Sequence, residues 1–151
     1  MTQETHDQLP LKLIDQFSYS PERFVVHSGI KEIVDSFEQI SIAHKYSINF
    51  IFGQECVGKT HLSIYMAKHG QIKVIANLIS GKEFGELIEA VNNKSLSVPE
   101  VLVVDDVDAY LNKIQPDHSG AFVTFIELCR RANSRIFLLS STSIEDLPCD
   151  D

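Results

Sequence analysis

The stretch that decides the fold is Gly53-Gln54-Glu55-Cys56-Val57-Gly58-Lys59-Thr60. It matches the pattern G-x-x-x-x-G-K-[ST] at every fixed position. The apolar run before it, residues 48–52, predicts a buried strand. The run after it, residues 61–68, has the spacing of an amphipathic helix with Leu62, Tyr65 and Met66 on one face. A glycine-rich loop between a strand and a helix is the context that a phosphate-binding P-loop requires.

The loop residues have distinct expected roles. Gly53 and Gly58 allow a tight turn that points backbone N–H groups at phosphate oxygens, and the helix N-terminus adds partial positive charge. Lys59 is expected to reach the β- and γ-phosphates, and the Thr60 hydroxyl to bind Mg²⁺. Cys56 is either a neutral loop residue or a redox switch. The predicted nucleotide-binding residues are Gly53, Gln54, Glu55, Cys56, Val57, Gly58, Lys59, Thr60 and His61.

The composition sets the class of protein. The chain has 151 residues, of which 44% are hydrophobic and 23% charged, which is ordinary for one globular domain. Its formal net charge of −8 argues against broad, sequence-independent DNA binding. It has no apolar run of bilayer length, and residues 1–7 are polar without a signal-peptide core, so we expect a cytoplasmic protein. The histidine and cysteine spacings predict no metal site beyond nucleotide-bound Mg²⁺.

Strands and helices alternate along the chain. Residues 1–22 have the composition of a tail, and residues 23–151 that of one domain. We expect strands at 48–52, 72–76, 101–106 and 135–141, and helices at 28–45 with Ser28 as N-cap, 61–68, 80–92 and 119–132. Residues 107–114 are expected to form a short helix or a turn. This alternation predicts an α/β fold, a three-layer αβα sandwich with a parallel sheet.

The strand at 101–106 ends in two acids, the form of a Walker B motif. Ligands bind at the carboxyl ends of strands in open α/β sheets. Asp105 is expected to hold Mg²⁺, mainly through its water ligands, and Asp106 to orient or deprotonate an attacking water. We therefore predict Asp106 and Lys59 as catalytic residues, and Thr60 and Asp105 as metal ligands. Ser140 and Ser141, at the end of the next strand, are candidate sensors of the γ-phosphate or simply polar residues that end a strand.

Several runs resemble the AAA+ core of the Hda/DnaA family of bacterial replication initiators, between Phe24 and Pro148. The resemblance implies binding of ATP or ADP with Mg²⁺. The matching runs are Phe24-Val25-Val26, Gly58-Lys59-Thr60-His61-Leu62, Val103-Val104-Asp105-Asp106-Val107, Phe125 to Arg131, Ile136 to Ser141 and Glu145-Asp146-Leu147-Pro148.

The segment Gln8 to Leu13 resembles the clamp-binding peptide of the Hda branch. The resemblance implies that Gln8, Leu9, Leu11 and Leu13 engage the DNA polymerase III sliding clamp (beta subunit) and that the protein acts on DnaA, switching the initiator off. The segment between the second and third strands is short and poor in Lys and Arg, which also favours the Hda branch. From the residues alone, the same alternating leucines also suit a first strand or an arm packed on the domain, or a linear peptide that docks in a partner's pocket.

The sequence departs from the family in three ways. His27 replaces the usual glycine and Ile30 a frequent asparagine. The chain stops at Asp151, before the family's fifth strand, arginine finger and helical lid. The resemblance then implies that strand 48–52 lies at a sheet edge and that the protein binds nucleotide with little intrinsic hydrolysis.

Two other functions remain open. A DnaA-like or helicase-loader-like ATPase would need a basic DNA-contacting surface and an arginine finger. A small-molecule kinase would need an acceptor site and lid arginines, which the sequence does not display. Formation of a homo-oligomer is compatible with both of these functions and with the Hda-like role.

Overall fold

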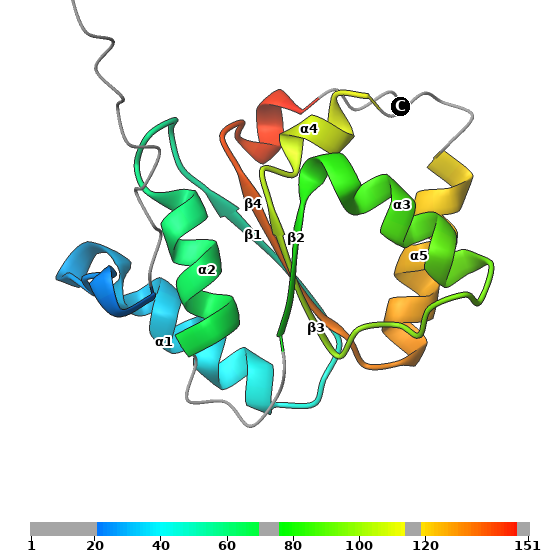
Figure 1. Ribbon diagram of the computed structural model, residues 1–151, viewed down its shortest axis with the longest axis horizontal. Coiled ribbons are helices and arrows are strands. Elements are labelled where there is room, and N and C mark those ends of the chain that lie inside the picture. The colour runs from blue at the N-terminus through cyan, green and yellow to red at the C-terminus, as the bar shows by residue number, and fades with distance from the viewer. Residues whose placement is uncertain (1–20, 70–75, 114–118, 148–151) are drawn as a thin grey trace, which may run out of the picture.

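The computed structural model describes residues 21–69, 76–113 and 119–147. Four parallel strands form its sheet in the order β1-β4-β3-β2 (Figure 1). The strands are β1 (Ser47–Phe52), β2 (Ala76–Ser80), β3 (Val101–Asp105) and β4 (Arg135–Ser140). The predicted α/β sandwich with a parallel sheet is confirmed.

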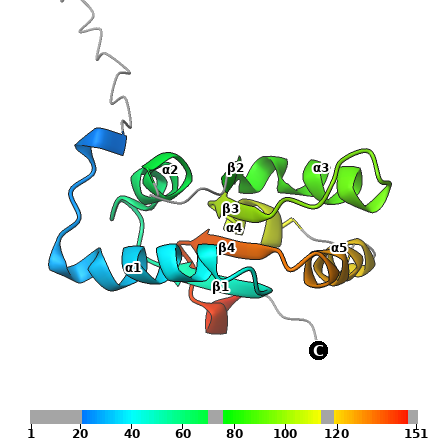
Figure 2. The same cartoon turned by 90° about the horizontal axis from the view of Figure 1, so that it is seen from below.

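Helices cover both faces of the sheet. Figures 1 and 2 show α1 (Ser28–Ile42) and α2 (Lys59–His69) on one face, and α3 (Gly81–Asn92) and α5 (Ser119–Arg131) on the other. A short helix, α4 (Asp108–Leu111), follows β3 at the carboxyl edge of the sheet (Figure 1). Two 3-10 turns, η1 (Pro21–Arg23) and η3 (Ile144–Asp146), complete the described elements.

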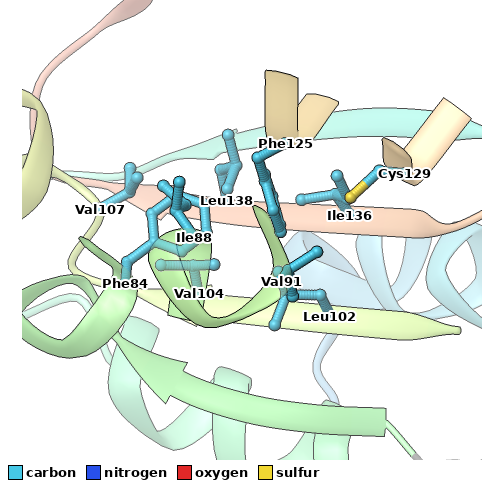
Figure 3. Close-up of a cluster of buried hydrophobic side chains, with 10 residues drawn as sticks. All are labelled: Phe84, Ile88, Val91, Leu102, Val104, Val107, Phe125, Cys129, Ile136 and Leu138. Atoms are coloured by element: carbon cyan, nitrogen blue, oxygen red, sulfur yellow. The ribbon is translucent and has the colours of Figure 1, made fainter. Parts of the chain in front are cut away.

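Side chains of the central strands alternate between two cores, as a strand buried on both faces requires. On one face, Val101, Val103, Phe137 and Leu139 pack against α1 and α2. On the other face, residues of β3 and β4 pack against α3 and α5 around Phe84 and Phe125 (Figure 3). Among the described residues, no helix is long and apolar enough to cross a membrane.

The strand register brings three loops to one edge of the sheet. Phe52 of β1 pairs with Ser140 of β4, and Ser80 of β2 pairs with Asp105 of β3. Val104 pairs with Leu138, so β3 and β4 also end at nearly the same height. The P-loop, the acidic pair and the end of β4 therefore leave the sheet side by side.

Strand β1 lies at the edge of the sheet, as expected. Its pairing partner is β4, which is buried at all six positions. In β1, by contrast, Ile48 is 44% exposed and Phe52 is 52% exposed. The described part of the chain thus leaves an apolar strand edge uncovered.

Several element boundaries differ from the sequence-based expectation by a few residues. Helix α1 begins at Ser28, but its N-cap is His27, whose Nδ1 accepts a hydrogen bond from the Gly29 N–H at 3.1 Å, and the helix ends at Ile42 rather than at residue 45. The described part of strand β2 is Ala76–Ser80, so the strand extends beyond the expected end at residue 76, and residues 72–75 lie outside the described part. Pairing with β3 sets the register of residues 76–80.

Candidate functional site

The P-loop follows β1 directly and is tied to the neighbouring strand. The N–H of Gly53 donates to the carbonyl of Ser140 at 3.1 Å. Two loop residues are left-handed, Cys56 with φ of 62° and Gly58 with φ of 93°. Glycine adopts such angles without steric cost, and the open loop lets its N–H groups face inward. The first turn of α2 begins at Lys59, so the helix N-terminus faces the same space.

The Lys59 side chain bridges the start of this loop. Its ammonium donates to the carbonyls of Gly53 at 2.6 Å and Gln54 at 2.7 Å. The charge therefore lies inside the curve of the loop. There an anionic oxygen can replace either carbonyl as acceptor and form a stronger, charge-assisted hydrogen bond.

A cavity of 650 Å³, the polar cavity, opens in front of the loop. It gathers predicted site residues that are far apart in the chain, from the P-loop, from the acidic pair and from the end of β4. Its lining residues are Glu55, Cys56, Gly58, Lys59, Thr60, His61, Asp105, Asp106 and Ser141.

A second cavity of 520 Å³, the apolar cavity, adjoins the polar one, with which it shares Gly58, Lys59 and His61. Its outer wall is built by the segment before α1, including Phe24. The Phe24 ring packs edge-on against His61 with centroids 5.0 Å apart. His27 and Ile30, the two residues that differ from the pattern of the resembling family, line this cavity. Together the two cavities have the polarity of a site for a planar base joined to phosphates.

The acidic pair sits in a strained turn at the end of β3. Asp106 has φ of 54°, in the left-handed region. The next residue is fixed to β4, because the N–H of Val107 donates to the carbonyl of Leu139 at 3.0 Å. The start of α3 touches the same turn: a Cβ added to Gly81 would lie 1.9 Å from the Asp106 carbonyl oxygen. Glycine is therefore required at position 81 for this turn.

The Asp106 carboxyl has a perturbed proton affinity. Burial raises its pKa, and the negative charges of Asp108 and Asp105 raise it further, while Lys82 and Lys59 act in the opposite direction. A carboxylate with a raised pKa in a polar cavity is a suitable proton acceptor. This environment fits the role predicted for Asp106.

Sequence reasoning missed Asp108. Its carboxylate, 7% exposed, receives three hydrogen bonds from the serine turn, which we define as Ser140–Thr142. Burial acts to raise the pKa of Asp108, but these hydrogen bonds outweigh it and hold the pKa below its usual range. The sequence offered one signal, a third acid two positions after the acidic pair. Its hydrogen-bond partner Ser140 lies 32 residues further along the chain.

The two candidate sensor residues have different surroundings. Ser140 is fully buried, and its hydroxyl lies 2.7 Å from Asp108 Oδ1 and 2.6 Å from the Thr142 carbonyl. Ser141 is partly exposed and lines the polar cavity. Of the two, Ser141 is the residue within reach of a ligand there.

The donor set suits Mg²⁺. The Thr60 hydroxyl and the Asp105 carboxylate line the same cavity, and hard oxygen donors in small number are what Mg²⁺ uses beside phosphates and water. The described residues contain no group of three or more His, Cys, Asp or Glu side chains placed to hold a metal ion.

Among the described residues, two arginines are not part of the polar cavity. Arg130 pairs with Glu127 at 2.8 Å, and Arg135 lies at the amino end of β4, so neither lines the polar cavity. The predicted clamp-binding residues Gln8, Leu9, Leu11 and Leu13 lie outside the described residues.

No protein-family model and no curated protein matches the chain. Solved structures match its fold. Domain III of the Thermotoga maritima initiator DnaA has a TM-score of 0.60 and 22% identity, over 85% of this chain and 58% of that one. A DnaA bound to AMPPCP and single-stranded DNA has a TM-score of 0.63 and 20% identity, over 86% and 44%.

The DnaC helicase loader is also similar, with a TM-score of 0.56 and 14% identity, over 84% of this chain and 79% of that one. The fold is thus similar to that of domain III of DnaA and of the DnaC helicase loader. The chain spans about half of the matched DnaA structures, 58% and 44% of their lengths.

Proposed function

We propose that this protein binds an adenine nucleotide with Mg²⁺ and acts as a regulatory module in the initiation of DNA replication. The observation that carries the nucleotide proposal is the polar cavity, where Lys59, Thr60 and the acidic pair meet. The similar DnaA bound to AMPPCP supports the choice of an adenine nucleotide.

The nucleotide would occupy both cavities. The base would lie in the apolar cavity beside Phe24, and the phosphates would follow the loop N–H groups into the polar cavity. Lys59 would exchange its carbonyl partners for phosphate oxygens. The shared wall of Gly58, Lys59 and His61 would then hold the junction between the two parts of the ligand.

Thr60 and Asp105 would hold Mg²⁺, which neutralises phosphate charge when bound. Asp106 would accept a proton from an attacking water. In the described residues, however, no arginine lines the polar cavity to stabilise charge on the transferred phosphoryl group. We therefore propose nucleotide binding with slow intrinsic hydrolysis.

Nucleotide binding is tested by calorimetric titration of the purified protein with ADP and with a non-hydrolysable ATP analogue. Lys59→Ala should weaken binding by about 100-fold. Lys68→Ala is the matched control, since Lys68 is an exposed lysine of the same helix. Absence of binding by the wild type, or equal binding by Lys59→Ala, would contradict the proposal. Rapid turnover lost in Lys59→Ala would instead contradict slow hydrolysis.

For the regulatory role we propose an Hda-like module that attaches to the sliding clamp through Gln8 to Leu13 and acts on DnaA. The support is the resemblance of those residues. Surface plasmon resonance with immobilised clamp tests it. The wild type should bind, and Gln8→Ala and the double variant Leu11→Ala, Leu13→Ala should not, while Gln3→Ala serves as control. If the wild type fails to bind, this role is rejected and nucleotide binding is unaffected.

A second candidate is a helicase-loader-like ATPase in replication, and the structural match to the DnaC loader favours it. Such a protein should bind single-stranded DNA, with affinity that falls steeply with salt. The net charge of −8 argues against that. A fluorescence anisotropy titration between 50 and 200 mM salt, roughly the range over which phosphate contacts are lost, separates the two candidates.

A further inference from the structure

Ser140 joins the two halves of the candidate site. Its carbonyl accepts the Gly53 N–H at the start of the P-loop, at 3.1 Å. Its hydroxyl lies 2.7 Å from Asp108, in the helix that follows the acidic pair. The chain then turns, and the next residue, Ser141, lines the polar cavity. Asp108 is therefore bonded to the turn that contains the cavity-lining Ser141.

The Asp108 carboxylate fixes the serine turn through both of its oxygens. Oδ2 accepts the backbone N–H of Ser141 at 2.8 Å. Oδ1 accepts the Ser140 hydroxyl at 2.7 Å and the Thr142 N–H at 3.3 Å. All three groups donate to the buried Asp108 carboxylate. An asparagine at this position would place its NH₂ group, itself a donor, against at least one of these donors. The position of Ser141 thus depends on an ionised carboxylate outside the cavity.

We propose that Asp108 is a positioning residue for recognition of the terminal phosphate: it holds Ser141 against the polar cavity, so that the protein distinguishes a nucleoside triphosphate from a diphosphate. This inference rests on the proposed nucleotide binding. The geometry favours the γ-phosphate end because Ser141 shares the cavity with the acidic pair and is absent from the apolar cavity. Asp108 itself does not touch the nucleotide.

The test measures dissociation constants for ADP and for a non-hydrolysable ATP analogue, both with Mg²⁺, and compares their ratio between variants. The wild type should prefer the ATP analogue. Asp108→Asn should shift the ratio toward ADP by about tenfold, because misplacement of one buried hydrogen-bonding group costs about that much in binding. ADP affinity itself should stay within about twofold, since the loop that holds the inner phosphates is unchanged.

The matched control is Asp146→Asn. Asp146 is an exposed acid just after the serine turn in the chain. Its carboxylate accepts a hydrogen bond from the Ser143 hydroxyl and none from the serine turn. This variant should keep the wild-type ratio. A thermal melt of each variant shows whether it is folded at the temperature of the titration.

A double variant separates positioning from general destabilisation. If Asp108 acts through Ser141, then Asp108→Asn should have little further effect on the ratio once Ser141→Ala is present. Additive effects of the two changes would overturn the inference. So would equal loss of affinity for both nucleotides in Asp108→Asn, or a wild type without preference. Failure of the wild type to bind either nucleotide would instead reject the proposed function itself.

Discussion

The two ends of β4 each hold a buried charged side chain, but the surroundings differ. At the amino end, the Arg135 guanidinium, 1% exposed, donates to the Ser41 carbonyl at 2.7 Å and to Glu100 at 3.0 Å. At the carboxyl end, Asp108 accepts three hydrogen bonds from the serine turn. The first group ties α1 to the sheet, about 16 Å from the cavity at 3.3 Å per residue. The second adjoins the cavity wall.

This difference indicates which of the two buried charges should affect ligand binding. The amino-end charge bonds to Ser41 and Glu100, neither of which lines the polar or the apolar cavity, so its removal should change stability alone. The carboxyl-end charge holds a turn that lines the polar cavity. Its removal should change both stability and nucleotide preference. The following changes test this contrast, from the largest expected effect to the smallest.

Removal of the amino-end charge should have the largest effect on stability. Arg135→Ala leaves the Ser41 carbonyl without its donor and creates a cavity, so we expect the free energy of unfolding to fall by about 3 kcal/mol. Chemical denaturation measures this value. Arg131→Ala, an exposed arginine of α5, is the control and should cost less than about 0.5 kcal/mol. A changed ratio of ATP-analogue to ADP affinity in folded Arg135→Ala would break the contrast.

Gly81→Ala should lower the free energy of unfolding by about 2 kcal/mol, because its Cβ would collide with the Asp106 carbonyl and force the backbone to shift. The shift displaces the acidic pair, so affinity for Mg²⁺-nucleotide should fall as well. Gly85→Ala in the same helix is the matched control. Its Cβ would meet Tyr110 at 3.5 Å, an ordinary contact, and alanine favours helix by about 0.5–1 kcal/mol. Equal behaviour of the two variants would contradict the close approach at position 81.

Asp108→Asn should lower stability by about 1.5 kcal/mol at pH 7, since hydrogen bonds to a charged group are lost. The pKa of Asp108 is lower in the folded than in the unfolded protein. The stabilisation by its carboxylate is therefore complete above the unfolded pKa, near 4, and is lost as pH falls through the folded pKa. Thermal melts from about pH 7 downward through the unfolded pKa should show the difference between wild type and variant shrinking as the pH falls. A constant difference across that range would contradict the role of the charge.

The smallest effect is expected at the surface of the amino end. His44 Nδ1 lies 3.2 Å from Glu100, but both side chains are at least half exposed. His44 has φ of 46°, so asparagine is the replacement that tolerates the backbone. His44→Asn should leave the melting temperature within about 2 °C, because exposed ion pairs contribute little. A larger loss would show that the network depends on its surface pair as well as on Arg135.

The sequence correctly predicted those elements whose local residue pattern is sufficient to determine their structure. The P-loop motif and the apolar runs of β3 and β4 led to the correct fold, and the order of motifs placed the acidic pair opposite the loop. The carboxyl end of β2 was predicted four residues too early, because pairing with β3, which places Ser80 beside Asp105, extends the strand to residue 80. The N-cap was wrong by one residue because a histidine ring nitrogen accepts the bond usually made by serine.

Contacts between distant residues were beyond the reach of sequence patterns. Asp108 and Ser140 are both ordinary polar residues beside recognisable motifs, and only the fold shows their 2.7 Å contact. The same holds for Gly81, since its requirement comes from a turn 25 residues later. The role of the clamp-like segment stays a prediction, because it lies outside the described residues.

The strand order has a consequence for synthesis. Strand β4 stands between β1 and β3 in the sheet, yet it is the last of the four described strands to leave the ribosome. Until residues 135–140 emerge, the P-loop strand and the acidic strand have no shared neighbour, and both expose unpaired edges. The strands that carry the candidate site are therefore brought together only after β4 has emerged. A nascent chain paused before β4 should be an attractive substrate for chaperones.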